Sequence, residues 1–150
     1  MIREANKFDF PKIIDLLLLF RKETPIEQIA YINNTDYVNK LLTHIVYGNG
    51  ICYVATFQDE IIGIIAGMID NVIWDPKTFI LRELVWYVEE EYRHTSAGYK
   101  LLKAYNDKAK ELILENRITM YTMTKMTNSP DFDFGKFGYK KAEEVWVAGV

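Results

Sequence analysis

The residues with the clearest chemical potential lie where an apolar strand leads into an amphipathic helix, at residues 83–102. The connecting loop carries Arg93 and His94, followed by the small residues 96–98. Small side chains let the backbone approach a ligand closely, and the first N–H groups of a helix form the positive end of its dipole. Arg93, helped by His94, adds positive charge beside them. The junction therefore predicts a cradle for a diphosphate that needs no Walker-type lysine.

A second candidate is Glu83, a carboxylate inside an otherwise apolar strand. Strand alternation would place four apolar side chains on its face: Phe79, Leu81, Val85 and Tyr87. Desolvation there would raise the pKa of the Glu83 carboxyl, which suits a general base near neutral pH. The alternative is that Glu83 pairs with a basic residue of a neighbouring strand or helix. The adjacent Arg82 points to the other face and is not that partner.

The composition is that of one globular domain. The 150 residues are 49% hydrophobic and 26% charged, so we expect a single domain over residues 1–150. With 18 Lys and Arg against 21 Asp and Glu, the formal net charge is −3. This balance argues against nucleic-acid binding through a general basic surface. Cys52 is the only cysteine and lies in a strand interior, so we expect buried packing and a reducing, cytoplasmic setting.

No segment predicts a membrane span or a metal site. Glu4 and Asp9 precede any apolar run, which argues against a signal peptide. The longest uncharged apolar stretch covers only residues 61–69, whereas a membrane-spanning helix needs about 20 residues. His44 and His94 are the only histidines and have no carboxylate at metal-binding spacing. We therefore expect a soluble protein that works without a metal.

Three amphipathic patterns predict helices. Pro11 suits the first turn of a helix, because its missing N–H would have no partner there, and Thr24-Pro25 stops this helix. Asp36 can cap a second helix that runs to about Tyr47. Apolar residues at i, i+3, i+4 and i+7 predict a third helix over residues 98–113.

Short apolar runs predict six strands, at residues 1–5, 51–57, 61–70, 78–88, 118–124 and 144–147. Residues 58–60 have the length of a hairpin connection, residues 71–77 form a loop, and Asn128 can open a short helix. The strand at 78–88 is apolar on both faces except for Arg82 and Glu83, so it should be central. This element order predicts an α/β fold with a mixed central sheet flanked by helices.

The loop between the central strand and the long helix resembles that of the GCN5-related N-acetyltransferase (GNAT) superfamily. The family's loop reads Gln/Arg-x-x-Gly-x-Gly/Ala, and this chain has Arg93-x-x-Ser96-x-Gly98. The run from Val88 to Arg93 is similar to the family's Val-x-Pro-x-x-Arg, with Glu90 where proline is usual. The resemblance extends over essentially the whole chain and implies a single-domain acyl-CoA N-acyltransferase fold.

The resemblance implies acetyl-CoA as co-substrate and an amine acceptor that attacks its thioester directly. Coenzyme A would lie between two splayed strands, with its pyrophosphate on the loop backbone and its pantetheine arm along the central strand. The cofactor-binding residues implied in this way are Trp86, Val88, Arg93, His94, Thr95, Ser96, Ala97, Gly98, Tyr99 and Asn128. For Asn128, a helix cap is the alternative reading. Family members often form dimers, which leaves a homodimer open.

Two positions depart from the family's pattern. Phe137-Gly138-Tyr139 resembles the family's C-terminal Gly-Phe turn, and the usual general acid is a tyrosine four residues before that glycine. This chain has Phe134 there, which has no proton to give. The alternative donors are Tyr87, Tyr121 and Tyr139, or the thiolate leaves unassisted. Ser96 replaces a loop glycine, which costs about 1 kcal/mol if the position needs a positive φ.

Acidic residues favour a cationic amine acceptor, either a small molecule or a protein. The acceptor groove would be built from residues 23–36, residues 71–77 and the C-terminal strands. Its acidic side chains would be Glu23, Glu27, Asp36, Asp70 and Asp75.

The alternative function is a catalytically idle GNAT-like protein with a binding, structural or assembly role. Phe134, Ser96 and the glutamates at 89–91, which lie close to the expected diphosphate, favour this alternative. Compact proteins of this kind also look similar to proteins encoded by bacteriophages. A generic nucleotide-binding domain is weaker, because the first strand is not followed by Gly-x-Gly-x-x-Gly.

Overall fold

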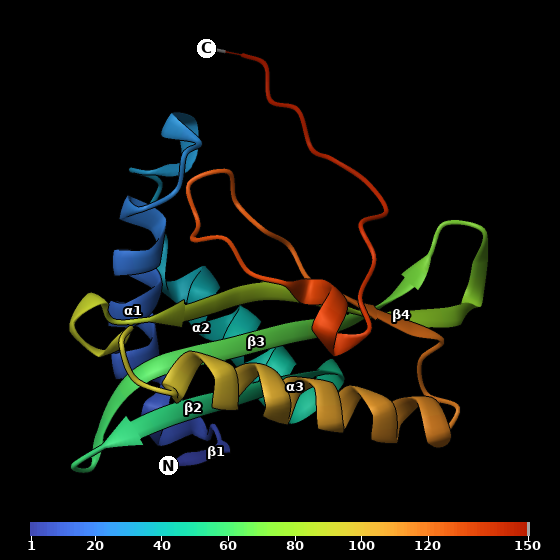
Figure 1. Cartoon of the computed structure of the whole chain (residues 1–150), viewed down its shortest axis with the longest axis horizontal. Helices are drawn as coiled ribbons and strands as arrows, with labels where there is room; N and C mark the ends of the chain where they lie inside the picture. Colours follow the sequence, from blue (N-terminus) through green and yellow to red (C-terminus); the bar gives the residue numbers. More distant parts are fainter. Residues whose placement is uncertain (150) are drawn as a thin grey trace.

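The computed structural model of the chain describes residues 1–149 and contains a five-stranded mixed sheet in the order β1-β2-β3-β4-β5 (Figure 1). The first four strands are antiparallel to their neighbours, and β5 runs parallel to β4. The strands are β1 Ile2–Glu4, β2 Gly50–Phe57, β3 Glu60–Val72, β4 Asp75–Val88 and β5 Met120–Thr122.

Helices cover both faces of the sheet (Figure 1). On one face lie α1 (Phe10–Lys22) and α2 (Thr35–His44), and on the other lies α3 (Ala97–Leu114). The shorter helical turns are η1 Lys7–Asp9, η2 Glu27–Ile29, η3 Ile45–Asn49, η4 Glu90–Tyr92 and η5 Phe134–Phe137. The predicted α/β fold with a mixed sheet between helices is confirmed.

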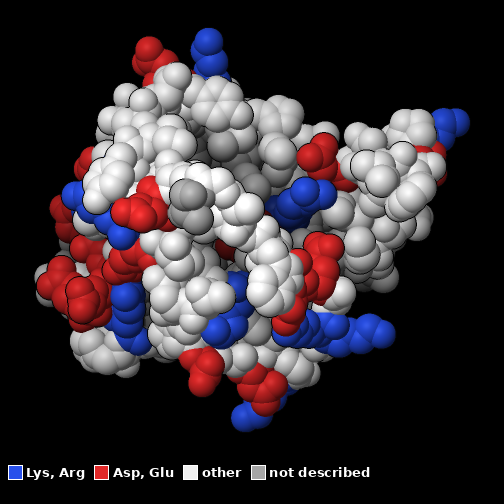
Figure 2. Space-filling model, turned by 90° about the horizontal axis from the view of Figure 1, so that it is seen from above, with Lys and Arg blue, Asp and Glu red and all other residues white. Residues whose placement is uncertain are grey.

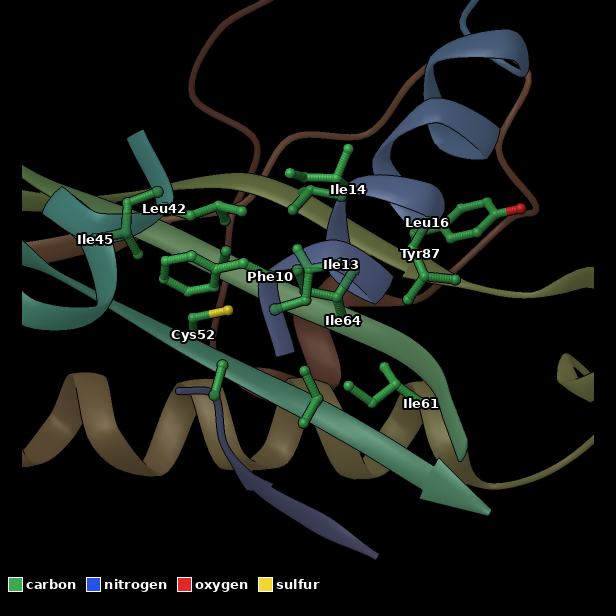
Figure 3. Packing of buried hydrophobic residues seen from close by; sticks show 14 residues of the cluster. Phe10, Ile13, Ile14, Leu16, Leu42, Ile45, Cys52, Ile61, Ile64 and Tyr87 are labelled. Carbon is green, nitrogen blue, oxygen red and sulfur yellow. The ribbon is translucent and has the colours of Figure 1, made fainter. Parts of the chain in front are cut away.

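Two apolar clusters hold these layers together. In the first, α1 and α2 pack on the sheet through side chains such as Ile13, Leu16 and Ile64, which have no exposed surface (Figure 3). Cys52 lies in this cluster, and burial raises the pKa of its thiol to about 12. Cys52 is therefore a packing residue rather than a nucleophile. The second cluster packs α3 on the opposite face.

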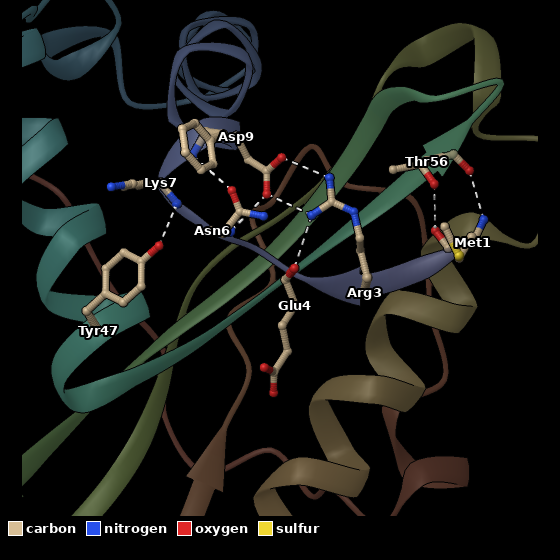
Figure 4. Close-up of polar contacts among 9 residues, drawn as sticks. Met1, Arg3, Glu4, Asn6, Lys7, Asp9, Tyr47 and Thr56 are labelled. Carbon is tan, nitrogen blue, oxygen red and sulfur yellow. Dashed lines mark hydrogen bonds and ion pairs between the residues drawn. The ribbon is translucent and has the colours of Figure 1, made fainter.

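A polar network ties the start of the chain to α1 (Figure 4). Arg3 donates two hydrogen bonds of 2.8 Å to the two carboxylate oxygens of Asp9. Asp9 also accepts the Asn6 backbone N–H at 2.8 Å. The Arg3 guanidinium holds the pKa of the Asp9 carboxyl below its usual range. The first strand and α1 are thereby fixed relative to each other.

The segment predicted as a loop at residues 71–77 is instead the tip of a long hairpin. β3 continues to Val72 and β4 begins at Asp75, so only Ile73 and Trp74 form the turn. Pro76 is tolerated in β4 because β5 begins to pair only at Ile80, which leaves the outer edge of β4 free there. The tip projects from the body at the right of Figures 1 and 2.

Two predicted C-terminal elements are absent from residues 1–149. No helix begins at Asn128, and the first helical turn after it is η5. The predicted strand at 144–147 lies outside the sheet, with Val145 80% and Trp146 87% exposed. Alternating apolar residues become a strand only where a neighbouring strand supplies hydrogen bonds and a buried face. In Figure 1 this red segment instead runs away from the sheet.

Candidate active site

A β-bulge in β4 determines where Glu83 points. Val85 pairs with Ala66 and Glu83 pairs with Gly67, so Leu84 is an extra residue without a partner on β3. The bulge shifts the alternation of side chains by one. Val85 therefore packs in the α1/α2 cluster, whereas Leu81, on the other side of the bulge, packs against α3.

Glu83 belongs to the α3 side of the sheet. Its carboxylate lies close enough to Tyr105 of α3 to affect the pKa of that tyrosine. The prediction that Glu83 shares a face with Leu81 is confirmed, and the prediction that it shares one with Val85 and Tyr87 is wrong. The bulge is the physical reason.

Glu83 is 7% exposed, and its Oε2 atom accepts the backbone N–H of Thr124 at 3.0 Å. Burial raises the pKa of the Glu83 carboxyl to about 7, partly offset by this hydrogen bond. No basic side chain among residues 1–149 forms an ion pair with it. Glu83 is thus a buried carboxyl that titrates near neutrality, as a general base requires.

The gap between β4 and β5 opens at Glu83. The two strands pair only at Ile80, Leu81 and Arg82 of β4. Beyond Arg82, β4 has no strand partner on this side within residues 1–149. Toward Val88 its main-chain groups pair with no other described strand on this side, although the Val88 carbonyl accepts Arg93 Nε at 2.8 Å. The remaining groups are of the kind that bind an extended ligand.

Tyrosine hydroxyls lie on the same side of the sheet as Glu83. Tyr105 is fully buried and donates to the carbonyl of Thr122 at 3.2 Å. Tyr139 donates to Asn106 of α3. Burial raises the pKa of Tyr139, and the nearby Tyr121 and Glu83 add to the increase. Of the alternative donors, Tyr139 therefore lies near Glu83, and Tyr121 packs edge-on against Tyr139 with ring centroids 5.5 Å apart.

Tyr87 does not lie near them, because it packs on the opposite face in the α1/α2 cluster. The predicted acid position, Phe134, packs edge-on against Trp86 with ring centroids 6.2 Å apart. Trp86 and Phe134 contribute apolar surface beside the open edge of β4. Neither supplies a proton.

The loop before α3 leaves backbone donors unpaired. Ser96 has φ −81°, so it needs no left-handed conformation and the predicted strain does not arise. The Gly98 and Tyr99 amides make no hydrogen bond within residues 1–149. Thr95 accepts the Ala97 N–H at 3.3 Å, and the exposed His94 side chain forms no hydrogen bond or ion pair within residues 1–149. The first turn of α3 thus has free donors of the kind that bind anions.

Gly98 lies against the end of β4. Its carbonyl accepts the indole N–H of Trp86 at 3.1 Å. A Cβ atom at Gly98 would be 3.7 Å from the side chain of Val88, an ordinary contact. Trp86, Val88 and Gly98 are therefore neighbours beside the free amides, and their contact with a cofactor stays a prediction.

Two predicted cofactor residues, Arg93 and Asn128, bond the C-terminal end of α1. Arg93 donates through Nε to the Val88 carbonyl at 2.8 Å and through one terminal nitrogen to both Glu23 oxygens at 2.9 and 2.7 Å. Asn128 donates to the Glu23 carbonyl at 2.6 Å. The reading of Asn128 as a helix cap is wrong, because its amide holds the end of α1 instead. A contact of Arg93 with phosphate stays a prediction.

Sequence reasoning missed Gly67, Tyr105 and Thr124. A Cβ at Gly67 would lie 2.9 Å from Tyr105 Cε2, so glycine is what lets this ring reach the sheet beside Glu83. The one available signal was a glycine inside an apolar strand, which often marks a bulge or a close approach. Thr124 acts through its backbone, so its residue type carried no signal.

The predicted acceptor groove does not assemble as expected. Figure 1 places the β3–β4 tip at the opposite end of the molecule from α1, and the C-terminal strand is not formed. Only the connection between α1 and α2 lies near the loop that precedes α3, joined to it by Glu23 and Arg93.

Other features of the described residues bear on the remaining expectations. No helix within residues 1–149 combines the length and apolar character needed to cross a membrane. No three His, Cys, Asp or Glu side chains among these residues gather in a way that could hold a metal ion. On the face drawn in Figure 2, basic and acidic side chains are interspersed.

Comparison with known proteins identifies the family. The model described as the acetyltransferase (GNAT) family matches residues 14–139. The match covers most of the chain, so this protein belongs to the GNAT acetyltransferase family. The resemblance inferred from the loop motif is confirmed. Among curated proteins, no significant match was found.

Solved structures with this fold include several acetyltransferases. An aminoglycoside acetyltransferase from an uncultured soil metagenomic sample, in complex with sisomicin, is 20% identical with a TM-score of 0.68, over 100% of this chain and 93% of that one. A predicted acetyltransferase from Clostridium acetobutylicum, solved with acetyl-CoA, is 14% identical with a TM-score of 0.73. The match covers 99% of this chain and 95% of that one. A transcriptional regulator from Bacillus halodurans is 18% identical with a TM-score of 0.72. The match covers 100% of this chain and 99% of that one. At these identities the similarity shows the fold.

Proposed function

We propose that this protein is an acetyl-CoA-dependent N-acetyltransferase. The observation that carries the proposal is the bulge at Leu84, because β4 and β5 separate there and Glu83 is buried at the point of separation. Membership of the GNAT family supports the same conclusion. A buried carboxyl that titrates near neutrality, beside an open strand edge, suits a transfer that needs a neutral amine.

The residues around this gap fit coenzyme A. The free amides of Gly98 and Tyr99 suit its diphosphate, and Gly98 adds no side chain between them and a ligand. The open edge of β4 near Trp86 and Val88 suits the amides of the pantetheine arm. When bound, acetyl-CoA supplies the thioester that carries the acetyl group.

The proposed chemistry is direct transfer. Glu83 takes a proton from the acceptor ammonium, and the neutral amine forms the new C–N bond at the acetyl carbon. The C–S bond breaks, and the thiolate takes a proton from solvent or from the hydroxyl of Tyr139. Main-chain N–H groups on the open edge of β4 stabilise the negative charge on the carbonyl oxygen.

The proposed acceptor is a cationic amine. Glu27 and Asp36 are exposed on and next to the connection between α1 and α2, which lies beside the loop that precedes α3. The aminoglycoside acetyltransferase of similar fold that was solved in complex with sisomicin supports an acceptor of this class. We propose a cytoplasmic setting because Cys52 is free, and a homodimer stays a prediction.

An acetylation assay with a panel of amines tests this function. Glu83→Gln is expected to lower kcat/KM roughly 100-fold and to remove the acid limb of the pH profile near pH 7. Asp107→Asn, on the exposed side of α3, serves as the control. An unchanged rate and pH profile in Glu83→Gln would show that Glu83 is not the base.

A second function is a GNAT-fold binding protein without turnover. The observation that favours it is the pairing of Arg93 with Glu23, which neutralises the arginine of the loop before the free amides. In that case the protein would bind coenzyme A or a partner and acetylate none of the amines in the panel.

A further inference from the structure

Three segments that are distant in the sequence meet at Glu23, the residue that follows the last turn of α1. Its carboxylate accepts two hydrogen bonds from Arg93, and its backbone carbonyl accepts one from Asn128 at 2.6 Å. In Figure 1 the loop after β4 and the segment after β5 both lie beside this end of α1. One residue therefore joins α1 to the loop before α3 and to residues 123–133.

The Arg93 side chain is fixed before it reaches Glu23. Its Nε bonds the Val88 carbonyl at the end of β4, and its guanidinium lies 5.1 Å from the centroid of the Tyr87 ring. Tyr87 is itself buried and packs edge-on against Phe20 of α1, with centroids 5.9 Å apart. These two contacts already fix the orientation of the Arg93 guanidinium. Little additional side-chain entropy is therefore lost when it binds the Glu23 carboxylate.

A second ion pair joins the same elements. Lys12 of α1 lies 3.2 Å from Glu89, the residue that follows β4. The loop after β4 is therefore held to α1 at two points, and the Glu23 contact is the one at the C-terminal end. The connection to α2 starts there and is held further along, where Arg21 donates to the Ile32 carbonyl.

We infer that Glu23 is a positioning residue that couples the loop before α3 to the connection between α1 and α2. The inference rests on the proposed function, which assigns the first of these segments to the cofactor and the second to the acceptor. Glu23 holds the acceptor side in place, and in doing so keeps the Arg93 cation away from a diphosphate on the free amides. The Arg93 guanidinium can therefore serve the acceptor side, through Glu23, or the cofactor side, through a phosphate.

This sharing predicts opposite changes at the two sites. In Glu23→Gln the Arg93 guanidinium stays on the Val88 carbonyl but loses the carboxylate that neutralises it, so its charge can attract an anion and coenzyme A should bind about 2- to 5-fold more tightly. The connection loses its anchor, so the KM for the amine acceptor should rise roughly 5- to 10-fold with little change in kcat. A variant that merely destabilised the fold would weaken both sites together.

The test combines calorimetric titration with coenzyme A, acetylation kinetics and hydrogen exchange of the ligand-free protein. Exchange should increase at residues 24–34 in Glu23→Gln, because the side-chain pair with Arg93 is lost while the Asn128 bond to the Glu23 backbone carbonyl remains. It should also increase in Arg93→Lys, which keeps the charge but loses the planar donors. Asp107→Asn, which removes a surface ion pair of 2.6 Å on α3, should change none of these measurements.

The outcomes separate the two proposals. Opposite shifts in the two affinities support the coupling. Parallel losses at both sites, or unchanged exchange at residues 24–34 in Glu23→Gln, would overturn it. If the unmodified protein binds no coenzyme A, the proposed function and the coupling both fail. Increased exchange in Glu23→Gln would then show that the anchoring contact exists without a catalytic purpose.

Discussion

Glu83→Gln should stabilise the protein at alkaline pH. Burial raises the pKa of the Glu83 carboxyl from 4.5 to about 7, so the folded state holds its proton more tightly than the unfolded state. Stability then falls as the pH rises from about 4.5 through 7. At 1.36 kcal/mol per pKa unit, the ionised carboxylate costs the folded state about 3 kcal/mol above pH 8. A glutamine avoids this cost because it does not ionise, and its amide oxygen can still accept the Thr124 N–H.

The difference between the two proteins isolates the titration of Glu83 from that of every other group. Denaturant unfolding should give nearly equal free energies at pH 4.5, with the variant about 3 kcal/mol more stable at pH 8.5. In thermal melts the same difference is roughly 6 to 12 °C for a chain of this size. If the two proteins differed in unfolding free energy by the same amount at pH 4.5 and at pH 8.5, Glu83 would not be a buried carboxyl without a charged partner.

Three further predictions test the packing and the binding surface. Gly67→Ala should lower the free energy of unfolding by roughly 1 to 3 kcal/mol, measured in urea, because its Cβ would lie 2.9 Å from Tyr105; unchanged stability would contradict that contact. Asp9→Asn should cost roughly 1 to 2 kcal/mol at pH 7, where the bonds from Arg3 are intact. Because the pKa of Asp9 is lowered in the folded state, this difference should disappear as the pH falls below about 4, and a difference that persists at pH 2 would refute the pairing. Gly98→Glu should weaken coenzyme A binding about tenfold or more without lowering Tm, whereas Gly98→Ala, whose Cβ would make an ordinary 3.7 Å contact with Val88, should leave binding almost unchanged.

The junction between β4 and α3 was predictable because its signals are local. The apolar repeat defines the helix, and the small residues before it mark the turn. The structure places the start of α3 at Ala97, one residue from the predicted start at Gly98. Glu83 was predictable as a buried carboxyl for the same reason, since its neighbours along the strand are apolar.

The surroundings of Glu83 depend on pairing between strands, which one sequence does not encode locally. The bulge at Leu84 reverses the face on which Val85 lies, and Thr124 reaches Glu83 through its backbone. The pairing of Glu23 with Arg93 joins residues 70 positions apart. Contacts of this kind follow from how α1 packs on the sheet, so the sequence alone favours a ligand as the partner of a charged loop residue.

At the C-terminal end, the preferences of single residues for strand or helix did not predict the structure. Residues 144–147 have the alternation of a strand, yet Trp146 is 87% exposed and the segment pairs with no strand of the sheet. Asn128 is a good helix cap by residue type, but its amide satisfies the end of α1. In both cases the residue types favour the predicted element. Within residues 1–149, however, no strand pairs with residues 144–147 and no helix begins at Asn128.

Calorimetric titration with acetyl-CoA tests the central proposal most directly, since every step assigned to Glu83 presupposes a bound thioester. Fragments that carry only the adenosine or only the pantetheine part serve as controls. We predict micromolar binding that requires both the diphosphate and the pantetheine arm and that Gly98→Glu weakens. No binding at millimolar acetyl-CoA would contradict the account, and would point to a protein that keeps the acetyltransferase fold for another purpose.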